Sequence, residues 1–128
     1  MKEIAGGVCA AKGFRAAGIH VGDKTHNVQK KDVALIVSDV KCAAAGVFTT
    51  NVVKAAPVLV SRAHLADGKA KAIVCNSGNA NACAPQGEEN AERMCDAAAK
   101  AIGCASGDVL VASTGVIGQT LKVDVIED

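Results

Sequence analysis

Aromatic side chains are nearly missing from this 128-residue sequence, which has two Phe and neither Trp nor Tyr. Proteins that bind single-stranded nucleic acid stack the bases on aromatic rings, so this composition argues against that class. The sequence also lacks an excess of either charge, because 14 basic and 13 acidic residues leave a formal net charge of +1. Surfaces for nucleic acid or for anionic membranes need a basic excess, and we therefore expect neither partner.

Long apolar runs are missing as well, and none approaches the ~18 residues needed to cross a bilayer. The first residues, MKEIAGGVCAAKGF, do not place a basic region before a long apolar stretch, as a secretory signal would. The six cysteines lie in apolar segments such as AIVCNSG and form no CxxC pair. This pattern favours free, buried thiols in a reducing compartment over disulfides, so we expect a cytoplasmic protein.

The sequence contains no recognisable metal-binding or nucleotide-binding motif. His20, His26 and His64 share no HxH or HExxH spacing, and the separation of Cys75 from Cys83 matches no common zinc pattern. The segment GGVCAAKGF lacks the Gly-Lys-Ser/Thr order of a phosphate-binding loop, and GVIG lacks the GxG turn of a dinucleotide site. We predict no metal and no cofactor.

Alanine, valine and glycine are abundant instead, which permits close packing between layers of sheet and helix. Short apolar runs bounded by Gly, Asp or Asn predict strands, and Pro57 would lie at a strand start or a sheet edge. Gly46 would mark a bulge or a close approach. The predicted strands, the first of them single or bent into a pair, are Gly6–Gly22, Asp32–Asp39, Cys42–Asn51, Ala56–Arg62, the start of Lys69–Ala82, and Gly107–Gly115.

One helix is predicted, over Glu88–Ile102, because apolar residues recur there with the period of one helix face. Gly103 follows the last of them and would end the helix. Several strands with one long helix predict a mixed α/β layered fold without internal domain boundaries. The final residues, LKVDVIED, predict neither a closing strand nor a helix stop. The apolar positions of the helix are Ala91, Met94, Cys95, Ala98 and Ile102.

Two stretches carry more polar groups than a simple strand needs. CNSGNANAC, Cys75–Cys83, has three amides, a hydroxyl and a glycine after an apolar run, and these groups offer donors and acceptors to a small polar ligand. VLVASTGVIG ends an apolar run in Ser113, Thr114 and Gly115. A hydroxyl beside a glycine N–H provides two adjacent donors, which is the pattern of an oxyanion hole.

The residues alone leave several interpretations of these stretches open. Hydroxyl pairs such as Thr49-Thr50 and Ser113-Thr114 commonly bond to nearby backbone in a turn, and this interpretation is the simplest. A nucleophile needs a base, and no His, Cys or carboxylate lies near Thr114 in the sequence. A turn, a nucleophile and a donor pair all remain open at this point.

Five segments together resemble the ornithine acetyltransferases of arginine biosynthesis, also called bifunctional glutamate N-acetyltransferase / amino-acid acetyltransferase. They occur in the order and spacing of that family from Gly6 to about Gly118, and FTTNVVKAAPV and NSGNANAC are the most specific parts. The segments are GGVCAAKGFRAAGIHVG, KDVALIVSD, AAAGVFTTNVVKAAPVLVSR, AIVCNSGNANAC and VLVASTGVIG.

The resemblance implies a layered sandwich of sheets flanked by helices, of the ornithine acetyltransferase/DmpA type and incomplete in this chain. It also implies a precursor that cuts itself before a threonine into an α chain and a β chain, which assemble as an α2β2 heterotetramer. The new terminal threonine of the β chain takes the acetyl group from N2-acetylornithine and passes it to L-glutamate without a cofactor. Some members of the family also accept acetyl-CoA and so make N-acetylglutamate.

The same resemblance assigns Thr114 and Gly115 to the oxyanion hole, through the hydroxyl of the threonine and the N–H of the glycine. The family's Ala-Thr cleavage junction does not occur before Asp128, and Thr120 in GQTLK does not match it. We therefore expect residues 1–128 to be the N-terminal portion of the α chain and to be inactive alone. The nucleophile and the substrate-binding residues would lie beyond Asp128.

Two other functions fit the sequence. One is a related threonine-nucleophile aminopeptidase or amidohydrolase, in which water and not an amine releases the acyl group. The other is a non-catalytic fragment that serves folding or assembly, because its small side chains suit a core that a partner completes. The residues that would separate these functions are not in this sequence.

Overall fold

The computed structural model describes residues 3–22 and 30–127, which form one four-stranded sheet in the order β1-β2-β3-β4. Strands β1, β2 and β3 are antiparallel neighbours, whereas β4 runs parallel to β3. A mixed α/β fold, as expected from the sequence, is confirmed. The strands are β1 (Phe14–Ile19), β2 (Val33–Ala43), β3 (Lys69–Asn79) and β4 (Val109–Val116).

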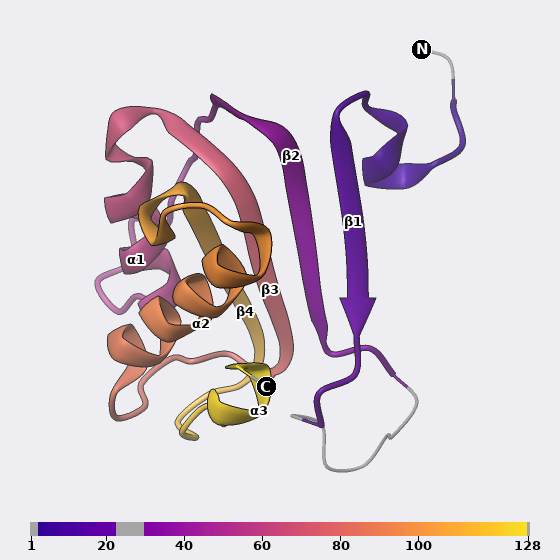
Figure 1. The fold of residues 1–128 in the computed structure, drawn as a ribbon. Coiled ribbons are helices and arrows are strands. Elements are labelled where there is room, and N and C mark those ends of the chain that lie inside the picture. Colours follow the sequence, from indigo (N-terminus) through magenta and orange to yellow (C-terminus); the bar gives the residue numbers. More distant parts are fainter. Residues whose placement is uncertain (1–2, 23–29, 128) are drawn as a thin grey trace.

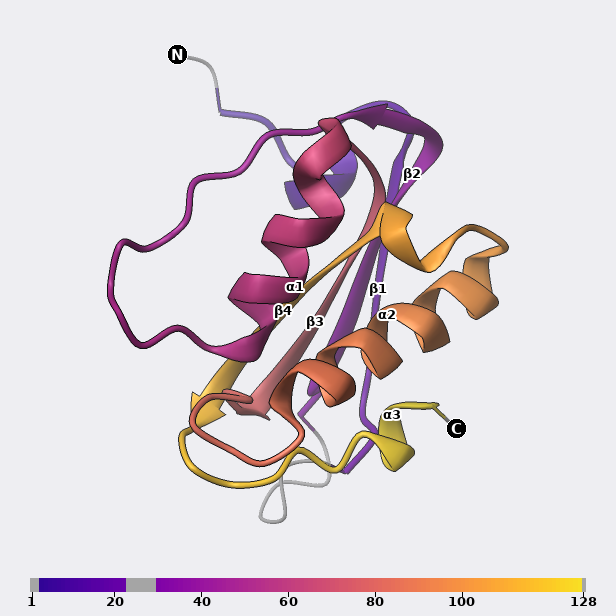
Figure 2. The ribbon, with the colours of Figure 1, turned by 90° about the vertical axis from the view of Figure 1, so that its left-hand side faces the viewer.

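The α-helices of the described residues lie on one side of the sheet. Helices α1 (Ala56–His64) and α2 (Gly87–Ile102) cover β3 and β4 (Figure 1), and they stand in front of these strands when the molecule is viewed from the helix side (Figure 2). Short 3-10 turns precede β1, β3 and β4: η1 (Gly7–Ala10), η2 (Leu65–Asp67) and η3 (Ser106–Asp108). None of the helices described is long and apolar enough to cross a membrane.

The core lies between the two helices and the sheet. Helix α2 follows the sequence prediction, and Met94 and Cys95 on its apolar face have no exposed surface. Gly103 ends the helix with a φ of 70°, a left-handed conformation that glycine adopts without strain. On the sheet, alternate residues point to the helices and are buried, as the two-residue period of a strand requires. They include Val37, Ala72, Val74, Val109 and Val111.

Residues 56–64 form helix α1, so the predicted strand over Ala56–Arg62 is wrong. The buried residues of this helix are Ala56, Pro57, Val60 and Ser61, which is the spacing of one helix face. Pro57 lies in the first turn, where its missing N–H costs no intrahelical hydrogen bond. A short apolar run that opens with proline fits the start of a strand and the start of a helix equally well.

The predicted strand Cys42–Asn51 is also wrong, because β2 ends at Ala43 and residues 44–55 form neither helix nor strand. Figure 2 shows this segment as a wide loop that leads from β2 to α1. Gly46 does mark a close approach, since a Cβ there would lie 2.8 Å from Cδ2 of Leu65. Thr49 Oγ1 accepts a hydrogen bond from the N–H of Asn51 at 3.2 Å, which favours the local-turn interpretation of that hydroxyl.

The remaining strands differ from the predictions mainly at their ends. β1 begins at Phe14 and not near Gly6, because η1 precedes it. β3 keeps strand geometry through Asn79. β4 continues to Val116, so Ser113–Gly115 lies inside a strand and the turn interpretation of this stretch is wrong.

The C-terminal residues, for which the sequence predicted no element, form the short helix α3 (Asp124–Glu127). The guanidinium of Arg93 on α2 donates hydrogen bonds to the carboxylates of Asp124 and Glu127. Leu121 and Val123 are 3% exposed and extend the core below α2. The segment is therefore packed, although its sequence contains no clear helix signal.

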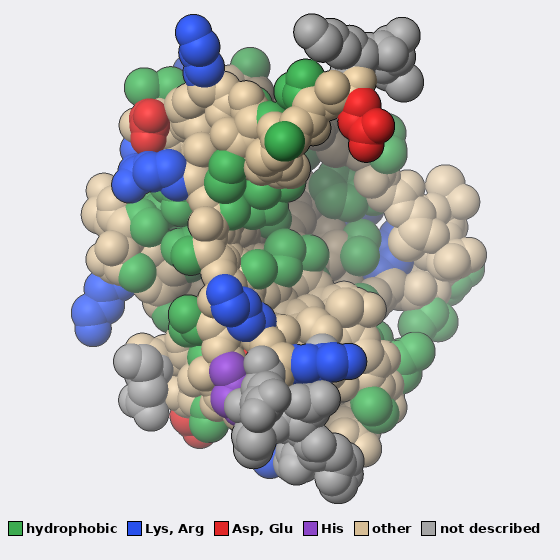
Figure 3. All heavy atoms as spheres, turned by 90° about the vertical axis from the view of Figure 1, so that its right-hand side faces the viewer, with side chains coloured by type: hydrophobic (Ala, Val, Ile, Leu, Met, Phe, Trp, Pro, Cys, Tyr) green, Lys and Arg blue, Asp and Glu red, His purple; other side chains and the backbone are tan. Residues whose placement is uncertain are grey.

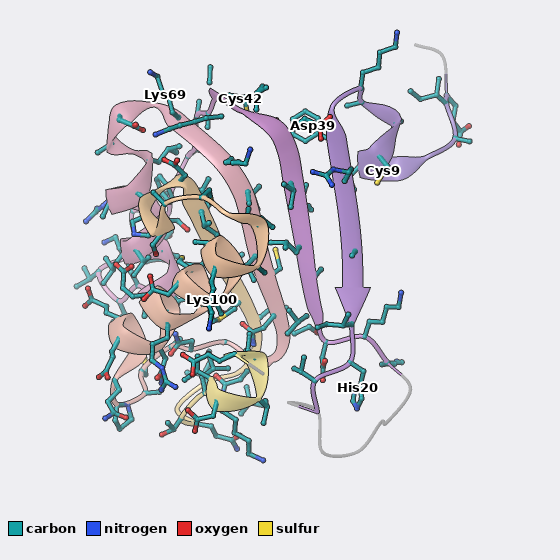
Figure 4. The ribbon with its side chains drawn as sticks, viewed as in Figure 1. Cys9, His20, Asp39, Cys42, Lys69 and Lys100 are labelled. Carbon is teal, nitrogen blue, oxygen red and sulfur yellow. The ribbon has the colours of Figure 1, made fainter. Side chains whose placement is uncertain are left out.

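All six cysteines are free thiols, as predicted, but they are not all buried. Cys95 lies in the core, whereas Cys83 and Cys9 are exposed, the latter on the turn before β1 (Figure 4). Burial, together with the charges of Glu92 and Asp96, raises the pKa of the Cys95 thiol to about 12. At neutral pH this group is a protonated thiol that packs like a small apolar side chain.

We expect alkylation of the native protein to distinguish these thiols. Iodoacetamide at mildly alkaline pH should modify Cys9 and Cys83 first, because these two residues are exposed to the reagent. Cys95 should react only after denaturant is added. Mass spectrometry of the peptides after brief exposure, with and without denaturant, measures the order, and early labelling of Cys95 in the native protein would contradict its burial.

Candidate active site

The two polar stretches singled out in the sequence lie side by side. The first forms the end of β3 and the second forms the end of β4, and the two strands run in the same direction. In this ladder Ser77 pairs with Thr114, and Gly78 pairs with Gly115. Helix α2 provides the crossover that two parallel neighbours require, so the ends of both strands meet at one edge of the sheet.

The contact between these strands demands glycine at position 115. Gly115 has a φ of 138°, in the region that other residues rarely adopt, and Gly78 has a φ of 132°. A Cβ on Gly115 would lie 2.2 Å from the carbonyl carbon of Gly78, far inside van der Waals contact. The two backbones therefore touch directly beside the Thr114 side chain.

Hydrogen bonds from side chains of helix α1 identify the backbone groups of β4 that point away from β3. Ser61 Oγ donates to the carbonyl oxygen of Val111 at 2.7 Å and accepts from its N–H at 2.8 Å. His64 Nδ1 lies 2.8 Å from the carbonyl oxygen of Val109. Backbone groups of alternate residues in a strand point to the same side, so the N–H of Gly115 is also directed to the outer edge of β4. Consistently, the carbonyl of Val116 points the other way and accepts from Ala80, the residue after β3.

The Thr114 side chain lies on the sheet face opposite the helices, because Val109 and Val111 alternate with it and are buried beneath them. Thr114 and Ser77 line a hollow of about 510 Å³, together with Lys31 among other residues. Figure 3 shows this face, on which hydrophobic side chains gather over the centre and basic side chains lie below. No local sequence signal pointed to these residues, because Ser77 lies on β3 and Lys31 lies just before β2.

The asparagine side chains of Cys75–Cys83 mainly form hydrogen bonds to backbone groups. Asn76 Nδ2 donates to the carbonyl of Asn79 at 2.9 Å, and Asn79 Oδ1 accepts from the N–H of Asn81 at 2.8 Å. Asn81 Nδ2 in turn donates to the carbonyl of Gly87 at the start of α2. All three asparagines are at most 5% exposed. This geometry favours a structural role for them over the contact with a small ligand that the sequence left open.

Other reactive groups near the hollow are held in structural roles. Cys75 lines it, but burial raises the pKa of its thiol and disfavours the thiolate that attack requires. The carboxylate of Asp32 is buried and accepts hydrogen bonds from the N–H groups of Val21 and Gly22, at 2.7 and 3.2 Å. Within the described residues the hollow thus offers the hydroxyls of Ser77 and Thr114 and no activated nucleophile.

His20 and His64 do not line the hollow that Thr114 lines, although His20 Nδ1 lies 3.3 Å from the carboxylate of Asp32 at its wall. His64 connects β4 to Glu92, with 3.1 Å between Nε2 and the carboxylate. His20 lies at the foot of β1 (Figure 4), with its Nδ1 2.9 Å from the carbonyl of Lys30. His26 is outside the described residues. Among the residues described, no three His, Cys, Asp or Glu side chains are close enough together to hold a metal ion.

Residues 15–128 match the sequence model of the ArgJ family. The chain belongs to this family. It is 52% identical over 125 residues to the arginine biosynthesis bifunctional protein ArgJ of Symbiobacterium thermophilum, a match that covers 97% of this chain and 31% of that protein. The ArgJ protein of Gloeobacter violaceus is 54% identical, over 96% of this chain and 30% of that protein. The chain therefore spans less than a third of the length of these relatives, and the resemblance to the ornithine acetyltransferases is confirmed.

Two solved structures have the same ArgJ fold. ArgJ from Bacillus halodurans superposes with a TM-score of 0.87 and 42% identity, and the match covers 95% of this chain and 63% of that chain. The ornithine acetyltransferase of Mycobacterium tuberculosis, in complex with ornithine, gives a TM-score of 0.86 and 41% identity over 92% of this chain and 64% of that chain. The expected ornithine acetyltransferase type of fold is thereby confirmed.

We expect Gly115→Ala to lower the free energy of unfolding by about 2–4 kcal/mol, because the new Cβ meets the Gly78 backbone at a strained φ. Gly107→Ala is the matched control, since no atom lies within 4 Å of its Cβ position and its φ is ordinary. The control should change stability by no more than about 0.5 kcal/mol. Urea denaturation of the full-length variants measures both, and equal stability of the two would show that the strands do not approach this closely.

Proposed function

We propose that this chain forms part of an acetyltransferase that moves an acetyl group from N2-acetylornithine to L-glutamate, with Thr114 and Gly115 as its oxyanion hole. The observation that carries the proposal is the position of two adjacent donors. The Thr114 hydroxyl lies on the open sheet face, and the Gly115 N–H is directed to the adjoining edge. The names of the relatives, which refer to arginine biosynthesis and ornithine, support this choice of substrates.

In the proposed reaction, a threonine outside this chain attacks the acetyl carbonyl of N2-acetylornithine. An N-terminal threonine carries its own base, because its α-amine can take the hydroxyl proton. The carbonyl oxygen becomes negative in the tetrahedral intermediate and accepts hydrogen bonds from Thr114 and Gly115. Collapse breaks the C–N bond, the amine of ornithine takes up the proton, and the acetyl group remains on the threonine. The amine of glutamate then attacks this ester, and the same two donors stabilise the second intermediate. Its collapse breaks the ester C–O bond, the threonine oxygen regains a proton that the attacking amine has lost, and N-acetylglutamate is released.

Donors of this kind act because they are fixed before the charge develops. The Gly115 N–H belongs to a strand whose position is set by contact with Gly78, so little reorganisation is needed when the oxyanion forms. Attack on the carbonyl carbon of a thioester also gives a tetrahedral intermediate with a negative oxygen. We therefore propose that acetyl-CoA can serve as a second acetyl donor, which agrees with the word bifunctional in the relatives' names.

The exposed apolar face of the sheet supports the proposal that a partner chain completes the site. Ile36, Ile73 and Leu110 are register neighbours across three strands on this face, and Ile73 is 37% exposed. An apolar sheet face of this kind is normally covered by a further layer of the protein. We propose that the β chain of the same precursor provides this layer and the nucleophile, in an α2β2 assembly. A cytoplasmic location stays a prediction.

We expect Thr114→Ala to lower kcat by about 10²- to 10³-fold in the full-length enzyme, because it removes one donor to the oxyanion. Initial rates of acetyl transfer from N2-acetylornithine to glutamate measure the effect. Thr114→Ser keeps the hydroxyl and should retain most of the activity. Thr50→Ala, which removes a hydroxyl from the exposed loop, is the control for a nonspecific loss. A Thr114→Ala enzyme with nearly normal kcat would exclude the donor role.

The purified 128-residue chain by itself should give no acetyl exchange with N2-acetylornithine and glutamate. The proposed reaction needs a threonine nucleophile that is not among its residues. Isotope-labelled acetylornithine and mass spectrometric detection of N-acetylglutamate provide the assay, with the full-length enzyme as the positive control. Robust transfer by the short chain would overturn the assignment of the nucleophile.

A further inference from the structure

Ser77 is the residue of β3 that lies directly beside Thr114. The two are register partners in the parallel ladder, and neighbouring strands are about 4.8 Å apart. Both side chains line the same hollow, and they are the two hydroxyl groups that do so among the described residues. Hydroxyl side chains on neighbouring strands can hydrogen-bond to each other when their χ1 rotamers direct the oxygen atoms inward.

In the described part of the chain neither hydroxyl makes a hydrogen bond, to the other or to a third group, so no existing partner opposes a bond between them. The backbone of Ser77 is nevertheless fixed, because its N–H donates to the carbonyl of Asp32 at 2.8 Å. The Asp32 side chain is itself held by two backbone N–H groups. Ser77 is therefore a hydroxyl on a rigid support that is free to turn toward Thr114.

A threonine that donates its proton to an oxyanion has oxygen lone pairs left to accept a hydrogen bond. A donor on that oxygen polarises the hydroxyl and strengthens the bond that it makes. It also restrains the hydroxyl from turning to nearby backbone carbonyls, which threonine side chains otherwise do. Ser77 is the side chain whose position suits this task.

We propose that Ser77 is a positioning residue, whose O–H donates to Thr114 Oγ1 and so directs the Thr114 hydroxyl to the developing oxyanion. This inference rests on the proposed function and extends it from a donor pair to a relay of two hydroxyls. Ser77 does not touch the substrate in this arrangement. Its contribution is therefore made entirely through Thr114.

A double-mutant cycle in the full-length enzyme tests the relay. Ser77→Ala should lower kcat about 3- to 10-fold with little change in KM, which is the range expected for one hydrogen bond. Ser77→Thr retains a hydroxyl and should restore kcat. In a Thr114→Ala background, Ser77→Ala should have no further effect, because the group through which it acts is gone. Urea unfolding of each variant identifies losses that come from the fold.

The outcomes separate the relay from the proposed function. Normal kcat for Ser77→Ala, or losses that multiply in the double variant, would overturn the relay while a large effect of Thr114→Ala left the oxyanion hole intact. A loss in Ser77→Ala that Ser77→Thr does not restore would also overturn it. If Thr114→Ala itself were fully active, the proposed function would fail, and the relay with it.

Discussion

Strands β3 and β4 touch through the backbones of Gly78 and Gly115, and the arrangement of the site depends on this contact. A side chain at position 115 would occupy the space of the Gly78 carbonyl carbon, 2.2 Å away. Because the strands are parallel, the same contact fixes the register that sets Ser77 beside Thr114. The crossover helix α2 makes the parallel pairing possible, and its buried residues Met94 and Cys95 hold it against the sheet. Core packing and site geometry are thus two results of one strand pairing.

Periodicity predicted the parts of the fold whose signal is local. Helix α2 shows its apolar face over four turns and ends at a glycine, so the prediction was correct to within a residue. Helix α1 was missed because its nine residues cover too few turns to establish a period, and Pro57 fits both element types. The loop over residues 44–55 was missed because Val47 and Phe48 resemble strand residues, although Val47 is 99% exposed. The apolar composition of a segment does not reveal which of its side chains are exposed to solvent in the fold.

The candidate site was predictable only in part. Resemblance to a family singled out Thr114 and Gly115 as a donor pair, whereas local chemistry alone had favoured a turn. Lys31 and Ser77 were not predicted as part of one site, because Ser77 comes beside Thr114 through strand pairing and Lys31, just before β2, lines the same hollow only in the folded sheet. The asparagines were overestimated as ligand groups for a similar reason. Their partners are backbone carbonyls and N–H groups, such as that of Gly87, which only the folded chain brings within reach.

Helix α1 also affects whether strands of other chains can pair with the outer edge of β4. An uncovered strand edge is a template on which strands of any other molecule can pair, and it is a common origin of aggregation. Ser61 and His64 occupy the backbone groups of Val111 and Val109, so the first half of this template is closed. The uncovered portion after Val111 is short, and it includes the Gly115 N–H that we propose as an oxyanion donor. By covering the rest of the edge, α1 limits the foreign strands that could pair with β4 and compete with a substrate for this donor.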